Sequence, residues 1–536
     1  MTSSLIRGRP RRATAHISVR VLHTVVGGLA AVVWLVLPWM TISSDVPVPA
    51  ARAHPAAASA AAPEQDGTSV ADLVLPLVAV GAVVVVAGYG YVRRTRRART
   101  RTTPGGGAAP AGPAAPPLSE LDHRVRALLV EADDWVRTSR EELGFAEARS
   151  GADSVAPFVR AVRDAEAELS AAFRMRQQYD DGVPEDETSR RHALAGMIGR
   201  CQEAGRRLDA EAAGFDLLRA LETADGLGEA LEVAEGRFRA LAARTGGAGA
   251  TPADLGRRYG SGAVDAVIGH AEQAKDRLVF ATTRLNQARQ AADMGEAADA
   301  ARHLRAAEGA TAQAEVFVAG IERLAADLAS AAGLVPAALT GAEAELADAR
   351  TARSGAGDLP AGELHARAAH ADLVLTAVRE ELTAGPYDPL DALRLLVRGL
   401  VPVGVGRFGV LSAAASLVAR SAVAEADAFV TTHRGAVGST ARTRLAEAER
   451  LLAEVPPDLL AADALARRAR DLAERDVRVH GNPVAGAAEH ETGAAGAIVG
   501  GILLGAAAQD GPPAGFGGPR TRARWAAPAS PGQAAG

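Results

Sequence analysis

The chain has 536 residues, a formal net charge of −5 and a hydrophobic content of 48%. This length suffices for two or three ordinary domains with packed cores, and so small a net charge excludes a strongly basic or strongly acidic protein. The single cysteine, Cys201, excludes an internal disulfide and any multi-cysteine metal site, which agrees with a reducing compartment. Aromatic residues contribute only 4%, and the apolar residues are mostly Ala, Leu and Val, which favours closely packed helices over a β-sandwich.

Residues 1–53 resemble a signal peptide or a signal-anchor helix. Arginines precede an apolar run over residues 24–40, and Ala51 and Ala53 form a small-x-small pattern of the kind that signal peptidase cleaves. If cleavage follows Ala53, one transmembrane helix remains downstream; if the run is retained, it is a first transmembrane helix. Residues 54–70 are then a short extracytoplasmic linker rich in Ala and Pro.

Residues 71–92 predict a transmembrane helix, because about 20 apolar residues at a rise of 1.5 Å cross a hydrocarbon core of about 30 Å. An arginine cluster follows at once and predicts the direction of the span, since arginines next to a span stay in the cytoplasm. The same cluster is expected to attract anionic lipid headgroups. Its members are Arg93, Arg94, Arg96, Arg97, Arg99 and Arg101. Residues 93–117 therefore form a cytoplasmic linker, Arg-rich and then rich in Gly, Pro and Ala, which we expect to be a flexible spacer.

Helical periodicity begins at residue 118 and continues to about residue 480, which predicts a domain of ten to twelve helices. In the first helix, apolar residues from Leu121 to Val136 recur at helical spacing, and Ser119 with Asp122 resembles a capping box. No window shows sustained period-two alternation, so no sheet is expected. The predicted breaks are Asp180–Pro184, Gly246–Pro252, Gly333–Pro336, Ser354–Pro360, Gly385–Pro389 and Val455–Pro457.

Two of these breaks carry helix-start signals. Thr251 and Asp388 each precede a proline, so each is predicted to cap a helix whose first position is Pro. A similarity between Leu304–Leu324 and Leu445–Leu465 suggests repeated helical hairpins. The predicted fold is all-α: one or two N-terminal transmembrane helices followed by a long cytoplasmic multi-helix bundle, spectrin-like or built of hairpin repeats.

Residues 481–536 form a tail rich in Gly, Ala and Pro, with a short apolar run at residues 493–508. The run contains two small-xxx-small patterns, Gly496 with Gly500 and Gly501 with Gly505, which let helices approach closely in lipid. About 16 residues are too few to span a bilayer comfortably. The favoured interpretation is a flexible tail; self-association or membrane dipping is the alternative.

The search for catalytic chemistry gives no constellation. The sequence has no P-loop, H-E-x-x-H, G-x-S-x-G or kinase motif. His365 and His370 are five residues apart and fall on different sides of a helix, so they are expected to be solvated. The acidic pairs Asp133-Asp134 and Glu141-Glu142 are also expected to be solvated, and Cys201 to be a small residue in a helix interface. No catalytic, cofactor-binding or metal-binding residue is predicted.

Several segments resemble a known family. These are VLPLVAVGAVVVVAGYGYVRRTRRARTRTTPGGG, LSELDHRVRALLVEADDWVRTSREELGFAEA, AGPYDPLDALRLLV, LAERDVRVHGNP and the closing GAIVGGILLGAAA with GFGGPRTRAR. Together they are similar to the membrane-anchored helical region of actinobacterial TPM-domain proteins, over roughly residues 70–536. In that family a signal peptide precedes an extracytoplasmic TPM domain, an α/β module sometimes credited with phosphatase activity. Here only about 30 residues separate the two apolar runs, so the TPM module is missing and no phosphatase residue can be transferred.

We therefore expect a non-catalytic scaffold or interaction protein in the plasma membrane, with its long C-terminal region in the cytoplasm. Its expected partners are membrane lipids, unidentified proteins and a second copy of the chain. One alternative is a hydrolase or phosphatase-associated envelope protein, implied by the family resemblance alone. The other is a lipid-surface or nucleic-acid binder through Arg-rich segments; nucleic acid is not expected, because Asp and Glu match Arg along the helices, as in Asp463–Asp476.

Overall fold

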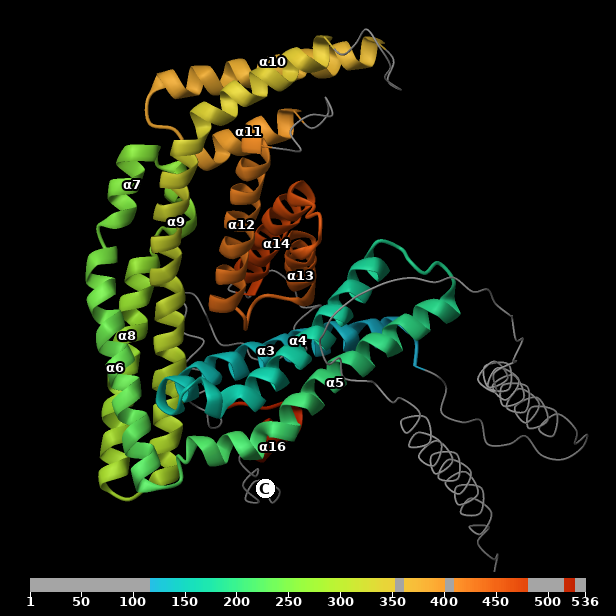
Figure 1. Ribbon diagram of the computed structural model, residues 1–536. Helices are drawn as coiled ribbons and strands as arrows, with labels where there is room; N and C mark the ends of the chain where they lie inside the picture. Colours follow the sequence, from blue (N-terminus) through green and yellow to red (C-terminus); the bar gives the residue numbers. More distant parts are fainter. Residues whose placement is uncertain (1–115, 352–360, 401–408, 481–514, 526–536) are drawn as a thin grey trace, which may run out of the picture. The chain divides into compact units, whose positions relative to one another are not determined.

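A computed structural model describes residues 116–351, 361–400, 409–480 and 515–525, and all of the regular structure in these ranges is helical (Figure 1). Twelve α-helices lie between residues 118 and 480, which confirms the all-α multi-helix bundle for the described part. Their bounds are α3 (Leu118–Ser150), α4 (Ala152–Asp180), α5 (Glu187–Arg219), α6 (Ala224–Ala248), α7 (Thr251–Tyr259), α8 (His270–Asp293), α9 (Ala297–Thr351), α10 (Ala361–Ala384), α11 (Pro389–Leu400), α12 (Gly409–Thr432), α13 (Ser439–Ala453) and α14 (Leu459–His480). A 3₁₀ turn, η1 (Gly262–Val267), precedes α8, and α16 (Pro519–Trp525) is the last described helix.

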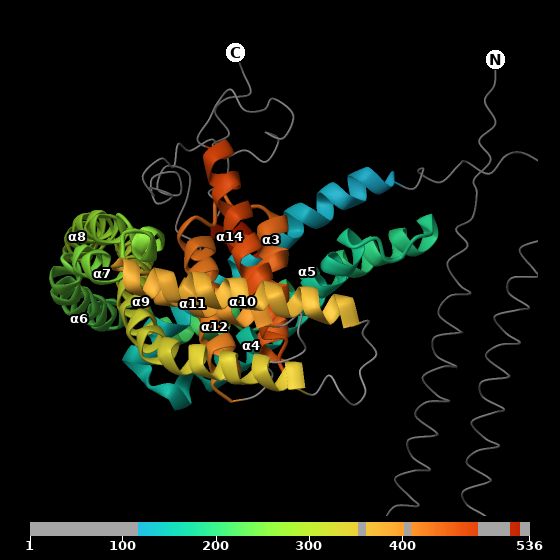
Figure 2. The ribbon, with the colours of Figure 1, turned by 90° about the horizontal axis from the view of Figure 1, so that it is seen from above.

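The helices pack in several groups, and two of the helices, α9 and α12, each belong to two groups (Figures 1 and 2). Helices α3, α4 and α5 pack together around one core, while α6 and α8 pack along the first part of α9. The second part of α9 joins α10, α11 and α12, and α12 continues into a group with α13 and α14. Because α9 and α12 each serve two groups, the described helices form one connected bundle.

Small residues make this close packing possible. Fully buried alanines recur on α8, α9, α12 and α14, for example Ala274, Ala338, Ala419 and Ala469. Alanine combines the highest helix propensity with the smallest side chain that can still pack, so helix axes approach closely without cavities. The first helix has the predicted dry face, with Val125, Leu129 and Val136 buried among others.

The helix starts are only partly as predicted. Asp388 caps α11, because its Oδ1 accepts from the N–H groups of Leu390 (2.9 Å) and Asp391 (3.2 Å). Ser119 is not a cap: α3 already begins at Leu118, and its N-cap residue, Pro117, makes no side-chain bond. The prediction that Thr251 caps a helix is also wrong. Thr251 is the first residue of α7, and its hydroxyl donates to the carbonyl oxygen of Gly247 (3.4 Å).

The predicted break at Gly333–Pro336 is wrong. Helix α9 runs through it for 55 residues with Pro336 inside. A proline within a helix costs about 3 kcal/mol, but Val335 and Ala338 on either side are fully buried, and their packing outweighs that cost. The prediction of repeated helical hairpins is wrong as well. Leu304–Leu324 lies within one helix, whereas Leu445–Leu465 crosses the turn between α13 and α14. The break at Ser354–Pro360 lies outside the described residues.

Residues 515–525 return to α3, α4 and α5, although their composition gave no signal of ordered packing. Phe516 is buried in the core of these three helices, and α16 lies against α5. The described fold therefore includes a segment that is separated from His480 by 34 residues of the sequence.

Two described helices, α9 and α12, are long and apolar enough to cross a membrane by length and composition alone. This is weak evidence for membrane association, because the core helix of a soluble protein passes the same test. Both helices also contribute to buried cores of the bundle. The predicted segments 1–53, 54–70 and 71–92, the arginine cluster, the cleavage pattern and the glycine patterns at 496–505 lie outside the described residues.

Candidate functional site

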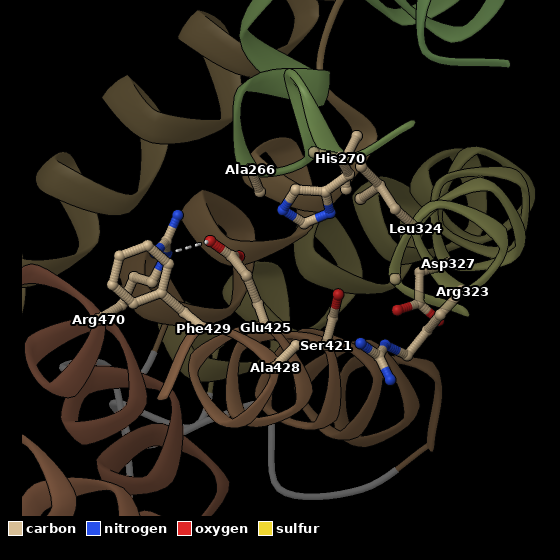
Figure 3. Close-up of a pocket in the computed structure, with 12 residues that line it drawn as sticks. Ala266, His270, Arg323, Leu324, Asp327, Ser421, Glu425, Ala428, Phe429 and Arg470 are labelled. Carbon is tan, nitrogen blue, oxygen red and sulfur yellow. Dashed lines mark hydrogen bonds and ion pairs between the residues drawn. The ribbon is translucent and has the colours of Figure 1, made fainter. Parts of the chain in front are cut away.

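A small pocket with a mixed polar and apolar lining lies where the start of α8 and the middle of α9 meet α12 and α14 (Figure 3). Gly269 adopts a φ of 78°, a left-handed conformation that glycine reaches without strain, and it turns the chain into α8 so that His270 faces the pocket. The cavity volume is about 40 Å³. This is room for a few water molecules, whereas pockets that bind organic ligands usually measure about 300–1,000 Å³.

Stacked rings and a guanidinium build one wall of the pocket. The Arg470 guanidinium lies 3.6 Å from the ring centroid of Phe429, and the His433 ring stacks on the same phenylalanine at 4.2 Å. Arg470 Nε donates to Glu425 Oε1 at 3.3 Å, the contact drawn as a dashed line in Figure 3. Arg470 is therefore held in place by cation–π and ion-pair contacts from α12, which fixes α14 against α12.

His270, which lines the pocket, is neutral at neutral pH. Burial lowers the pKa of His270 to about 4, and the nearby Arg470, His433 and Arg323 lower it further. Burial also lowers the pKa of His433. His270 Nδ1 has no hydrogen-bond partner within the described part of the chain, so no bond there joins it to the Ser421 hydroxyl across the pocket. A nucleophile–base relay needs such a bond, and an imidazole with a pKa of about 4 is a weak base.

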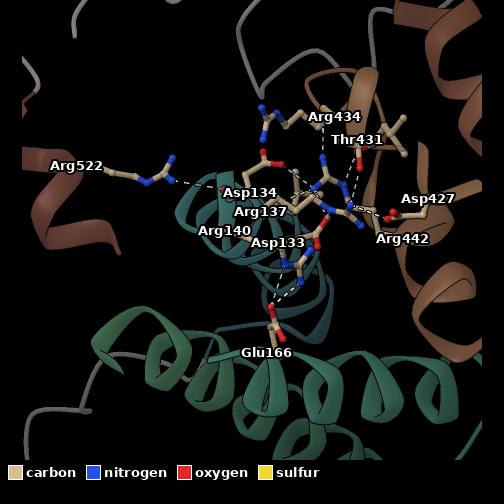
Figure 4. A network of polar contacts seen from close by, with 12 residues as sticks. Asp133, Asp134, Arg137, Arg140, Glu166, Asp427, Thr431, Arg434, Arg442 and Arg522 are labelled. Atoms are coloured by element: carbon tan, nitrogen blue, oxygen red, sulfur yellow. Dashed lines mark hydrogen bonds and ion pairs between the residues drawn. The ribbon is translucent and has the colours of Figure 1, made fainter. Parts of the chain in front are cut away.

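An ion-pair network joins α3 to α12 and α13 (Figure 4). Asp133 accepts from Arg137 at 3.0 Å and from Arg442 at 2.5 Å, and Arg442 also reaches Asp134 at 2.8 Å. Burial alone raises the pKa of Asp133, but Arg137 and Arg442 outweigh it and hold the pKa below its ordinary value. The prediction that this acidic pair is solvated is wrong for Asp133, because partners from a helix about 300 residues away cover it.

The second acidic pair is also part of the interior. Glu141 accepts from Arg434 at 3.0 Å, while Glu142 is buried 3.8 Å from Arg219 and 3.9 Å from Arg305. Arg219 in turn donates to both oxygens of Glu308, at 2.8 and 2.7 Å, between α5 and α9. Isolated charges of this kind are costly to bury, so their pairing specifies how α3, α5 and α9 align. The solvated interpretation fails here because the sequence does not show which distant arginines fold against these carboxylates.

A larger and more open cleft, of about 370 Å³, lies at the start of α3 beside α4 and α5. Its acids are already paired: Arg176 donates to Asp122 and to Asp180, and Arg126 lies 2.9 Å from Asp122. Asp122 and Asp180 are therefore both engaged in ion pairs within the cleft.

Other residues singled out in the sequence have ordinary structural roles. Cys201 is fully buried in the core of α3, α4 and α5, which confirms the helix-interface interpretation, and burial raises its pKa to about 12. His365 and His370 are exposed on α10, as expected. Among the described residues, no three His, Cys, Asp or Glu side chains are placed to hold a metal ion. The pocket residues His270 and Arg470 were missed, because no motif links positions 200 residues apart.

Two curated relatives are similar to the chain: UPF0603 protein MT2410 and UPF0603 protein Rv2345, from two strains of Mycobacterium tuberculosis. Each is 33% identical over 432 residues, which cover 76% of this chain and 64% of the relative. The chain thus spans somewhat less than two thirds of the length of these relatives. No protein-family model and no solved structure matches the chain.

Proposed function

We propose that the chain is a non-catalytic scaffold, anchored in the plasma membrane by residues 71–92, whose helical bundle lies in the cytoplasm and binds other proteins. One observation carries the proposal. Most of the buried charged side chains of the described helices pair with charges on other helices, as in Arg219 with Glu308 and Arg442 with Asp133, and the small pocket beside His270 has a volume of only about 40 Å³. Charged side chains that pair inside the bundle stabilise the packing of its helices and are not free to act in catalysis.

We also propose that the chain is related to the helical region of TPM-domain proteins. The relatives extend over about a third of their length beyond the matched region. The segments that resemble that family lie within residues 70–536 and carry this part of the proposal.

Proximity labelling tests the scaffold directly. A labelling enzyme fused after Gly536 of the full chain is compared with the same fusion from which residues 118–525 have been removed, so that both carry the same membrane segments. We expect the full chain to label a set of cytoplasmic proteins that the shortened chain does not label. Identical sets from the two fusions would contradict a scaffold role for the bundle.

The orientation needs its own measurement. A reporter fused after Gly536 should behave as a cytoplasmic protein, because arginines that follow a span remain on the cytoplasmic side. Alkaline phosphatase, which folds only outside the cytoplasm, should therefore be inactive in this fusion. Strong phosphatase activity would overturn the proposed orientation, while a cytoplasmic signal would leave the scaffold proposal to the labelling experiment.

A further inference from the structure

Residues 515–525, which we term the tail segment, bind to a surface of α3, α4 and α5 through one buried aromatic side chain. Phe516 is 1% exposed and stacks on Phe215 of α5, with ring centroids 4.4 Å apart. Its ring also meets Phe158 of α4 edge to face at 5.9 Å. Phe158 and Phe215 themselves are in edge-to-face contact, so the three rings form one cluster to which the tail segment supplies the third member.

A single carboxylate accepts hydrogen bonds from the backbone that follows Phe516. Asp209 of α5 accepts from the N–H groups of Gly518 (2.9 Å), Arg520 (3.1 Å) and Thr521 (3.0 Å), and from the Thr521 hydroxyl (2.7 Å). It thus acts as the N-cap of α16 from another part of the chain. Charge-assisted bonds of this kind are about twice as strong as neutral ones, and their fixed geometry sets the register of the tail segment on α5.

Glycines make the contact close. A Cβ on Gly518 would lie 2.2 Å from the carbonyl oxygen of Gly205, so only glycine fits at this position. Gly517 has a φ of 137°, which other residues rarely adopt, and its N–H donates to the Ser139 hydroxyl at 3.2 Å. Gly205 is equally restricted, because a Cβ there would lie 2.6 Å from Cδ of Pro519. The tail segment and its receptor surface therefore match each other residue by residue.

We propose that this surface, the tail groove formed by Ser139, Phe158, Gly205, Asp209 and Phe215, is a peptide-recognition site whose ligand is the sequence Gly-Phe-Gly-Gly-Pro-x-Thr. The tail segment is the intramolecular ligand, and the same peptide supplied in solution competes for the groove. Contacts from one buried anchor, one carboxylate and two restricted glycines are the elements by which peptide-binding domains select a short motif. The proposal does not depend on membrane anchoring or on the scaffold function.

A cleavable full-length chain tests the proposal without disturbing the fold. A site for a specific protease is inserted between Ala494 and Ala495, the protein is purified in detergent, and the peptide bond is cut after folding. We expect the C-terminal fragment to remain bound during gel filtration, because its contacts to the groove are unchanged. An excess of a synthetic peptide of residues 515–525 should then displace it and bind in its place, as measured by fluorescence anisotropy of a labelled peptide.

Variant peptides show whether recognition is specific, and they cannot damage the protein. The Phe516→Ala peptide should bind at least about 100-fold more weakly, since removal of a buried Phe side chain forfeits most of its packing. Gly518→Ala should bind at least about tenfold more weakly because its methyl group meets the Gly205 carbonyl. Arg520→Ala is the matched control: its side chain is exposed, so its affinity should stay within about twofold.

Three results would overturn the proposal. Loss of the fragment after cleavage, together with failure of the labelled peptide to bind, would show that the groove has no affinity of its own. The Phe516→Ala and Gly518→Ala peptides would bind as well as the natural one if the contacts were nonspecific. Full-length protein with Asp209→Ala would retain the fragment and bind the peptide normally if the carboxylate had no role in recognition.

Discussion

At the scale of single residues, burial decides the chemistry of the few reactive groups. Cys201 is the only cysteine, and the core of α3, α4 and α5 encloses it completely. Because the thiolate is the reactive form, a pKa raised to about 12 makes the Cys201 thiol of the folded protein unreactive. We expect Ellman's reagent at pH 8 to react with folded protein about 1,000-fold more slowly than with urea-unfolded protein. A folded rate within tenfold of the unfolded rate would show that the thiol is accessible.

His270 predicts a pH-dependent contribution to stability. Its folded pKa of about 4 lies below the ordinary value of 6.5, so the folded state disfavours the protonated ring. The neutral His270 ring therefore contributes its full stabilisation above pH 6.5, and this stabilisation is lost as the pH falls toward 4. The loss in the free energy of unfolding is about 3 kcal/mol. The arginines facing the ring are Arg323 and Arg470, the second histidine near it is His433, and the acids at the pocket are Asp327 and Glu425.

Urea unfolding of wild type and His270→Gln between pH 7 and pH 4 measures this effect. The free energy of wild type should fall relative to the variant by up to about 3 kcal/mol across that range. His365→Gln, which removes an exposed imidazole, is the control and should run parallel to wild type. A constant difference between wild type and His270→Gln would show that the ring titrates normally.

At the scale of helices, buried ion pairs should matter far more than surface pairs. The Arg442 side chain is 1% exposed and bridges α13 to Asp133 and Asp134 of α3. Arg442→Met leaves a buried carboxylate with Arg137 as its remaining partner, so we expect a loss of about 3–5 kcal/mol in the free energy of unfolding. The size of the loss follows from removing one partner of a desolvated pair, since the Met side chain itself is compatible with a helix.

The matched control lies on the same helix. Arg450 is 34% exposed, and its partners are Glu447 on α13 and Glu454, the residue that directly follows the helix. Arg450→Met should therefore cost less than about 1 kcal/mol. Both variants are measured by urea unfolding followed by far-UV circular dichroism. Equal losses in the two would mean that Arg442 contributes no more than a surface charge.

The helices also show what local sequence can and cannot predict. Asp388 before Pro389 was recognised correctly because a cap depends on residues only two or three positions away. Pro336 was misread because the packing that keeps α9 continuous comes from α11 and α12, distant in sequence. Asp133 was misread for the same reason: its partner Arg442 is 309 positions away. The docking of Phe516 was missed because a Gly-rich tail has no periodicity, and only its receptor explains its glycines.

At the scale of the whole molecule, the position of the membrane anchor is the main prediction still to be measured. The sequence assigns the anchor to residues 71–92, while α9 and α12 of the bundle are also long and apolar enough to cross a membrane. The buried ion pairs of α9 favour residues 71–92 as the anchor. Helix α9 carries Arg305 and Glu308 in a buried network with α3 and α5, and these contacts require the neighbours to lie beside it rather than lipid.

Two substitutions in the proposed anchor distinguish these possibilities. Val84→Arg together with Val86→Arg places two charges near the centre of the apolar run, at a cost of about 2.5–3.5 kcal/mol each. If residues 71–92 are the principal anchor, we expect the double variant to leave the membrane fraction or to be degraded. Val84→Leu with Val86→Leu is the control and should remain in the membrane. Because the substitutions leave α9 and α12 untouched, full membrane recovery of the arginine variant in carbonate-washed vesicles would transfer the anchoring role to those helices or to residues 24–40.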